Sequence, residues 1–153
     1  MLHKVVQLGG KSYFWLEKTN VVSMIQEYQV SGFRVREYEE LGSTNTEAER
    51  VGWDELEDKM VILTYRQTQG RGQIGNHWES EPGKNISMTV VFKPRELPAG
   101  QQFAVSMVIA LGTYDFISRY VGECSVKWPN DIYVGDRKIS GILIEHSIMG
   151  RYV

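Results

Sequence analysis

A glycine-rich polar segment at residues 66–85 separates two short apolar runs, MVILTY at residues 60–65 and ISMTVVF at residues 86–92. Short runs rich in β-branched and apolar residues are typical of buried strands. A long connection between two strands usually carries function, because rigid elements then hold its backbone in place for a ligand. The sequence therefore predicts a strand, a long functional loop and a second strand.

The following part of the chain mixes helical and strand-like patterns. Apolar residues recur at helical spacing over residues 99–121, which predicts an amphipathic helix. Three strand-like runs follow at residues 126–128, 132–134 and 139–145, and Gly135-Asp136 gives a two-residue hairpin signal between the last two runs. These patterns predict an α+β fold with a mixed, mostly antiparallel sheet packed with helices.

The first forty residues contain patterns of secondary structure but no motif that indicates a function. Residues 21–29 (VVSMIQEYQ) fit a short helix, and residues 33–40 (FRVREYEE) alternate as a strand does. We find no helix-turn-helix pattern before Leu41.

Composition excludes several classes of function. The chain has 17 Lys plus Arg against 19 Asp plus Glu, a net charge of −2, so we expect neither DNA binding nor attraction to anionic membranes. It has no long apolar run and no signal-peptide pattern, which predicts a cytoplasmic protein. A single cysteine and three scattered histidines argue against disulfides and metal cages.

The glycine-rich segment formally matches G-x-G-x-x-G through Gly70, Gly72 and Gly75. A dinucleotide-binding unit requires a helix after these glycines, but the residues that follow are turn formers leading into a strand. A Walker A motif is excluded because GK[ST] is missing. With both motifs rejected, we interpret the segment as a flexible loop whose backbone N–H groups can face an anion. Its Arg71 suits carboxylate or phosphate oxygens. An ordinary surface loop stays open as the alternative.

Lys127 lies in a strand-like run beside Trp128. A lysine that points from a strand into a cleft can stabilise a developing negative charge. The alternative is that Lys127 faces solvent through strand alternation.

The segment LGSTNTEAER at residues 41–50 contains a helix-capping signal. Thr44 with Glu47 fits a capping box, and Ser43 with Thr46 is a poorer version of it. Either cap leaves Ser43, Thr44 and Asn45 at the beginning of a helix, where hydroxyl and amide groups can bind the polar end of a ligand.

Three motifs together resemble the catalytic domain of biotin protein ligases. They are S-T-N at residues 43–45, Q-T-x-G-R-G-x-x-G-x-x-W at residues 67–78, and K-W-P-N-D-x-Y-x-x-x-R-K-x-x-G-I-L-x-E at residues 127–145. The resemblance covers about residues 36–147 and implies a class II aminoacyl-tRNA synthetase-like fold. We accordingly expect a catalytic domain at residues 36–153 and an N-terminal extension of unknown role at residues 1–35.

The resemblance implies an ATP-dependent ligase that modifies another protein. The biotin carboxylate would attack the α-phosphate of Mg-ATP to form biotinyl-adenylate. A lysine of a biotin carboxyl carrier domain, in acetyl-CoA carboxylase or a related carboxylase, would then take the biotinyl group. No protein nucleophile is needed, which agrees with a chain that shows no serine or cysteine spaced with a general base.

The resemblance also implies roles for individual residues. Arg71 and Lys127 would be catalytic, since they would engage the carboxylate and the phosphate and offset the repulsion between two anions. The implied biotin-binding residues are Ser43, Thr44, Asn45, Gln67, Arg71, Gly72, Gln73, Lys127 and Gly141. The implied nucleotide-binding residues are Arg71, Trp78, which would lie against adenine, and Asn130. No metal-binding residue is assigned.

The sequence departs from the family pattern at two places. Gln73 stands where many relatives carry a second arginine that helps to hold the adenylate. Relatives also continue beyond the position of Val153 into a strand with G-x-G-x-N and an SH3-like barrel, so we expect a catalytic domain that is incomplete at its C-terminus and lacks the barrel. An uncovered strand at residues 139–145 would then be an edge open to homo-oligomerisation.

Two other functions remain open. The chain can be a truncated biotin-binding module with little or no ligase activity, or a relative of the lipoate and octanoate ligases. The polar side chains of Ser43, Thr44, Asn45 and Gln67 argue against a fatty acyl ligand, because an acyl chain would leave them without partners.

Overall fold

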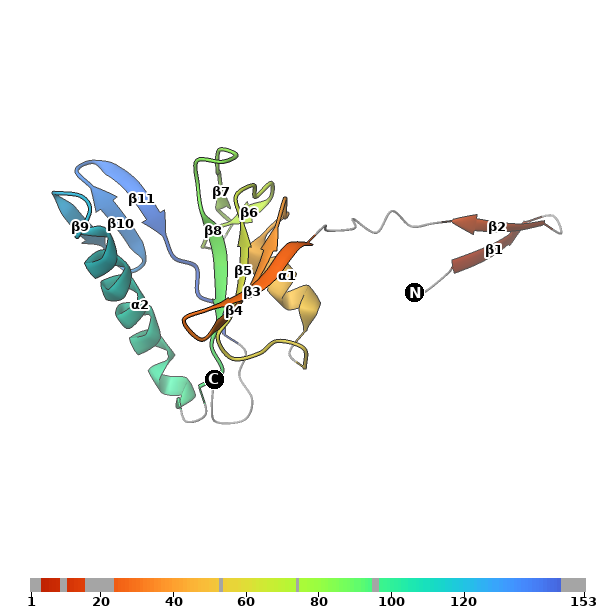
Figure 1. The fold of residues 1–153 in the computed structure, drawn as a ribbon, viewed down its shortest axis with the longest axis horizontal. Coiled ribbons are helices and arrows are strands. Elements are labelled where there is room, and N and C mark those ends of the chain that lie inside the picture. Colours follow the sequence, from red (N-terminus) through yellow and green to blue (C-terminus); the bar gives the residue numbers. More distant parts are fainter. Residues whose placement is uncertain are drawn as a thin grey trace.

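The computed structural model describes residues 4–8, 11–15, 24–52, 54–73, 75–94 and 97–146. A four-stranded sheet and a three-stranded sheet lie side by side, and each packs against one helix (Figure 1). Near the N-terminus, β1 (Lys4–Leu8) and β2 (Lys11–Trp15) form an antiparallel hairpin. The predicted α+β class with mixed and antiparallel sheets is confirmed.

The four-stranded sheet has the order β3-β4-β5-β8. Its strands are β3 (Met24–Val30), β4 (Phe33–Tyr38), β5 (Met60–Thr64) and β8 (Ser87–Val91). The central pair, β4 and β5, is parallel, and both outer pairs are antiparallel. The predicted strands at residues 33–40, 60–65 and 86–92 are confirmed, with slightly shorter bounds.

The helix predicted at residues 21–29 is wrong over the part that the structure describes, because Met24–Val30 is strand β3. The reason lies in the next two residues. Ser31 and Gly32 have positive φ of 49° and 80°, which is the backbone of a two-residue hairpin turn, and this turn pairs β3 with β4. The expected division between residues 35 and 36 falls inside β4, and it remains a prediction about domains.

The main core lies between the four-stranded sheet and α1 (Thr44–Val51), the helix that connects the parallel strands β4 and β5. Strand β5 is central and contributes Met60 and Ile62, both fully buried. The cluster around Ile62 also contains Tyr38, Leu41 and Ala48. This core fixes α1, and therefore the residues at its N-terminus, against the sheet.

The predicted functional loop contains a small hairpin. Its strands are β6 (Gly70–Arg71) and β7 (His77–Trp78), with Gly70 opposite Trp78 and Arg71 opposite His77. A parallel bridge between Leu41 and Gln67 ties the beginning of the loop to the chain just before α1. The loop is therefore held beside the N-terminus of α1.

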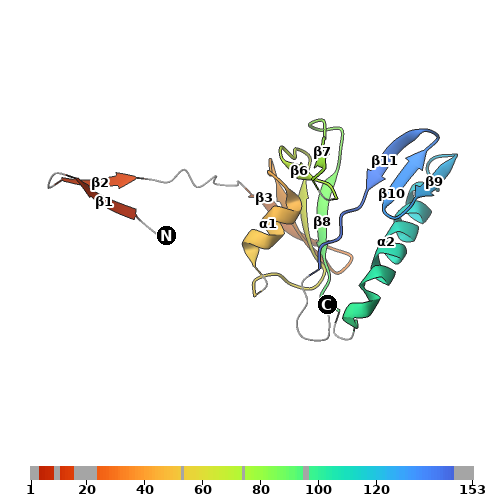
Figure 2. The ribbon, with the colours of Figure 1, turned by 180° about the vertical axis from the view of Figure 1, so that it is seen from behind.

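The second sheet has the order β11-β10-β9 and is antiparallel. Its strands are β9 (Cys124–Lys127), β10 (Asp131–Val134) and β11 (Arg137–Gly141). The predicted hairpin turn is confirmed, since Gly135 has φ of 55°. The strand predicted at residues 139–145 ends at Gly141; the backbone N–H of Ile142 then donates to Asn130, the residue just before β10. Figure 2 shows the chain after β11 passing toward β8 and α1.

The helix predicted at residues 99–121 is present as η1 (Ala99–Gln101) followed by α2 (Gln102–Ile117). The expectation that an amphipathic helix here buries its apolar face is wrong. Phe103, Met107 and Leu111 are all exposed, and only Ala110 of the helix is buried. The physical reason is that α2 contacts only β9 and β10 among the sheet strands, so most of its apolar surface has no cover within the described residues.

None of the helices that the structure describes is long and apolar enough to cross a membrane.

Candidate functional site

The predicted helix-capping segment does form the N-terminus of α1, with Ser43 as the cap. The Ser43 hydroxyl accepts a hydrogen bond from the backbone N–H of Thr46 at 3.4 Å. The capping box between Thr44 and Glu47 is wrong, because α1 already includes Thr44 and because the Glu47 carboxylate binds the guanidinium of Arg50 at 2.7 and 2.8 Å. Ser43 and Thr44 are buried.

Gln67 reaches from the loop to the start of α1. Its Oε1 accepts the backbone N–H of Thr44 at 2.9 Å and lies 3.4 Å from the Thr44 hydroxyl. Its Nε2 makes no hydrogen bond with the described residues, so this amide donor is open to a ligand. Three of the residues predicted to bind biotin, Ser43, Thr44 and Gln67, are therefore brought together.

Thr89 on β8 completes this group from the sheet. Its hydroxyl lies 2.9 Å from Thr44 Oγ1 and makes a short hydrogen bond to Asn45 Oδ1. An Asn45 amide whose oxygen faces Thr89 turns its Nδ2 group outward, where it donates to Glu145 Oε2 at 2.6 Å. Thr89 thus orients a predicted ligand-binding side chain.

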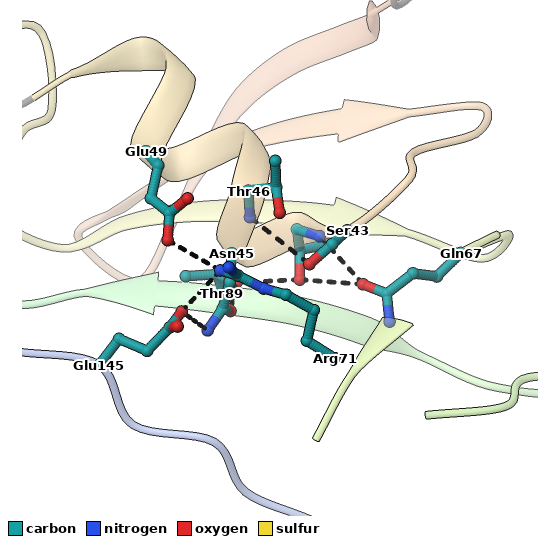
Figure 3. Close-up of polar contacts among 9 residues, drawn as sticks. Ser43, Asn45, Thr46, Glu49, Gln67, Arg71, Thr89 and Glu145 are labelled. Carbon is teal, nitrogen blue, oxygen red and sulfur yellow. Dashed lines mark hydrogen bonds and ion pairs between the residues drawn. The ribbon is translucent and has the colours of Figure 1, made fainter. Parts of the chain in front are cut away.

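Arg71 on β6 lies beside the same helix end (Figure 3). Its Nη2 lies 2.8 Å from Glu49 Oε1 and 2.9 Å from Glu145 Oε2. The hydrogen bond to Glu49 and the charges of both carboxylates raise the pKa of Arg71, against a lowering by burial. Arg71 therefore stays positively charged, and it shares Glu145 as a partner with Asn45.

Trp78 on β7 packs against β11 of the second sheet. A Cβ atom on Gly141 would lie 2.7 Å from Trp78 Cζ3 and 2.9 Å from Lys138 Cε, so only glycine fits between these side chains. The Lys138 ammonium lies 4.9 Å from the centroid of the Trp78 ring and 2.8 Å from Asp131 Oδ1. Gly141, which the resemblance implies as a biotin-binding residue, thus packs against Trp78.

An open cavity of about 440 Å³ lies between the two arms of the loop. Gln67, Gly70 and Trp78 are among its lining residues. A Cβ atom on Gly70 would overlap the Trp78 carbonyl oxygen and lie 2.7 Å from Gln67 Nε2, so glycine is required here for the loop to close. The cavity is large enough for a small organic ligand.

Four other predicted residues lie apart from this group. The Lys127 ammonium is on β9, 5.3 Å from the Tyr133 ring, and it makes no hydrogen bond or ion pair with the described residues around Arg71. Asn130 donates from Nδ2 to the carbonyl of Ile142 at 2.7 Å. Gly72 and Gln73 take part in the turn of the loop through backbone hydrogen bonds with Asn76.

Sequence reasoning missed four residues of the site, namely Gly70, Thr89, Glu49 and Glu145. Gly70 and Glu145 both stand at fixed positions of the quoted motifs, so a signal for them existed. Thr89 and Glu49 lie in an ordinary strand and on a helix surface, where no local pattern distinguishes them.

The described residues contain no group of three or more His, Cys, Asp or Glu side chains that could hold a metal ion. The arrangement is instead one of amide and hydroxyl groups, one guanidinium and one aromatic ring at the junction of two sheets. Such groups suit a polar neutral group, an anionic oxygen and a flat ring, respectively.

Comparison with known proteins identifies the family. The family model described as Biotin/lipoate A/B protein ligase family matches residues 38–152. The bifunctional ligase/repressor BirA of Escherichia coli is 31% identical over 144 residues, which are 92% of this chain and 44% of that protein. A biotin–[acetyl-CoA-carboxylase] ligase of Paracoccus denitrificans is 35% identical over 113 residues, covering 71% of this chain and 45% of that protein.

A solved structure agrees with these relatives. The biotin acetyl coenzyme A carboxylase synthetase of Helicobacter pylori, solved with bound biotinylated ATP, matches with a TM-score of 0.57 and 28% identity, over 74% of this chain and 55% of that one. The chain spans about half the length of the curated relatives named above. With a family model matched over most of its residues, the chain belongs to the biotin/lipoate A/B protein ligase family.

Proposed function

We propose that this chain carries the biotin-activating site of a biotin protein ligase. The observation that carries the proposal is the convergence of Asn45, Gln67 and Arg71 at the N-terminus of α1, with Gln67 also lining the cavity that Trp78 lines. Relatives named as biotin ligases, and a structural neighbour with bound biotinylated ATP, support biotin and ATP as the ligands.

In the proposed first step, a carboxylate oxygen of biotin forms a bond to the α-phosphorus of ATP, and pyrophosphate leaves with the electron pair of the broken P–O bond. Two anions have to approach each other, and Arg71 offsets their repulsion. The open Nε2 of Gln67 suits a neutral ureido carbonyl, while the Trp78 ring offers adenine a stacking surface that contributes about 1–3 kcal/mol.

In the proposed second step, a carrier lysine amine attacks the acyl carbon of biotinyl-adenylate. An amide forms, AMP leaves, and the amine loses a proton. We propose a biotin carboxyl carrier domain as the acceptor. Lys127 remains a candidate catalytic residue through its motif position, and Mg²⁺ is expected with ATP; no protein ligand for it is assigned among the described residues.

A biotin-dependent exchange of pyrophosphate into ATP tests the proposal. We expect the purified chain to catalyse this exchange and Arg71→Ala to slow it by about 10- to 100-fold, because hydrogen bonds to charged groups contribute about 1.5–3 kcal/mol. Arg119→Ala, an exposed arginine after α2, is the matched control and should keep wild-type exchange. Equal rates in all three proteins would contradict the role of Arg71.

The same assay separates the two other functions. Biotin binding without any exchange would favour the truncated binding module. Exchange driven by lipoate or octanoate better than by biotin would favour the lipoate ligase relative. The Thr44 hydroxyl already has partners within the protein, whereas the Ser43 hydroxyl only accepts a hydrogen bond, so Gln67 Nε2 and the Ser43 O–H are the donors that would carry the polar preference for biotin.

A further inference from the structure

The segment at residues 142–146, which we call the strap, connects the two halves of the molecule. It leaves β11 after Gly141. At its start, Ile142 is held by Asn130, with hydrogen bonds of 2.9 Å to the backbone oxygen and 2.7 Å from the side-chain amide. Near its end, Glu145 reaches residues of α1 and β6. The strap has neither helix nor strand pairing between these two anchors.

The Glu145 carboxylate lies where two hydrogen-bond donors converge. A single oxygen, Oε2, accepts from Asn45 Nδ2 at 2.6 Å and from Arg71 Nη2 at 2.9 Å (Figure 3). Thr89 fixes the Asn45 amide so that its Nδ2 faces this oxygen. A guanidinium and an amide donor that converge on one oxygen form an arrangement that carboxylate and phosphoryl oxygens equally satisfy.

The local charge argues that a ligand must replace Glu145 rather than join it. Arg71 already faces two carboxylates, Glu49 and Glu145, so the group carries a net negative charge. A further anion would meet repulsion there. Both carboxylates are partly exposed, Glu49 at 58% and Glu145 at 44%, but Glu49 stands on helix α1, whereas Glu145 stands on the strap, which has neither helix nor strand pairing. Glu145 is therefore the carboxylate that can leave.

We propose that Glu145 is an internal competitor for the anion subsite formed by Asn45 and Arg71, and that a carboxylate or phosphoryl oxygen of the ligand displaces it. Displacement frees the end of the strap while Asn130 keeps its start in place. The identity of the ligand rests on the proposed function, but the competition itself rests on the contacts of Glu145.

Isothermal titration with matched variants tests the displacement. Wild type, Glu145→Gln and Glu49→Gln are titrated with biotin, with biotinol, the neutral alcohol of biotin, and with AMP. Equal melting temperatures of the three proteins confirm that they fold. We expect Glu145→Gln to bind the displacing anion about two- to fivefold more tightly than wild type, which is the range for breaking a partly exposed ion pair.

Each outcome has a definite meaning. A gain for biotin but not for biotinol supports the proposal and identifies the displacing group as the carboxylate. A gain for AMP instead supports it and identifies a phosphoryl oxygen. Equal gains in Glu145→Gln and Glu49→Gln would show a general charge effect and overturn the displacement, as would unchanged affinities that leave biotin binding intact. Absence of binding in every variant would overturn both this inference and the proposed function.

Discussion

The region at residues 24–94 and the region at residues 97–146 bury their apolar side chains very differently. Of the nine hydrophobic residues that are buried in the described part of the chain, the first region contains seven, namely Val35, Tyr38, Leu41, Ala48, Met60, Ile62 and Leu63. Among its described side chains the second region buries only Ala110 and Ile132, while Phe103, Leu111 and Phe116 are about half exposed or more. One region has its own core, and the other is an open layer.

This difference bears on how the site is built. The first region supplies the α1 N-terminus and Arg71, and the second contributes through the packing of Gly141 on Trp78 and the contact of Glu145 with Asn45. A ligand at this junction would contact a well-packed region on one side and a region with few buried apolar side chains on the other. Motion on ligand binding is therefore expected in the second region.

The largest expected effect compares one fully buried isoleucine from each region. Ile62→Ala should lower the free energy of unfolding by about 3–4 kcal/mol, because its cavity lies in a packed core. Ile132→Ala should cost about 2 kcal/mol, because its half-exposed neighbours can move into the space. Urea denaturation followed by circular dichroism measures both. An equal or larger loss at Ile132 would break the comparison.

The ion pair between the exposed Arg50 and the buried Glu47 comes next. Glu47 is only 4% exposed, so Arg50→Ala leaves a buried carboxylate without its cation. We expect a loss of about 2–3 kcal/mol in the free energy of unfolding. Arg66→Ala removes an arginine whose partner Glu40 is exposed, and it should cost less than about 0.5 kcal/mol. Similar decreases in the free energy of unfolding of the two variants would show that burial of Glu47 does not strengthen its ion pair with Arg50.

Tyr38 adds a pH dependence to the same region. Burial, followed by the charge and hydrogen bond of Glu47, raises the pKa of Tyr38 above its ordinary value of 10.0. A raised folded-state pKa means that the contribution of Tyr38 is complete below pH 10.0 and is lost as the pH rises through the folded-state value. Tyr38→Phe should cost about 1 kcal/mol at pH 8.

That cost should shrink as the pH rises above 10.0, since the wild type then loses stability that Tyr38→Phe never had. Unfolding in urea at a series of pH values measures the difference. A cost that grows with alkaline pH would contradict the sign of the shift.

The smallest effect is expected on α2. Leu111 is 58% exposed, so Leu111→Ala removes little buried surface and should change the free energy of unfolding by less than about 0.5 kcal/mol. Thermal unfolding provides the measurement. A loss above about 1.5 kcal/mol would show that this face of α2 is covered in solution and that the second region is less open than described.

Local patterns predicted most strands, because a strand such as β5 is specified by its own run of apolar residues. Strand β3 was mistaken for a helix because MIQEYQV fits either pattern. Its pairing with β4 depends on the Ser31-Gly32 turn rather than on its own residues. The apolar residues of α2 follow a helical period, yet the sequence does not say whether anything packs on them.

The candidate site shows the same limit. Asn45, Gln67 and Arg71 were predicted from their motifs, and their contacts bring them together. Glu49 and Thr89 belong to the site only through the geometry of the fold, which no local pattern encodes. Lys127 shares a motif with Gly141, but the order of the strands puts β9 at the far edge of the sheet from β11.

Titration of biotin into the purified chain, with and without ATP and Mg²⁺, tests the central claim that this junction is a biotin-activating site. We predict saturable biotin binding in the absence of ATP and additional heat from adenylate formation in its presence. A chain that is folded, as circular dichroism would show, and yet binds no biotin under either condition would contradict the account.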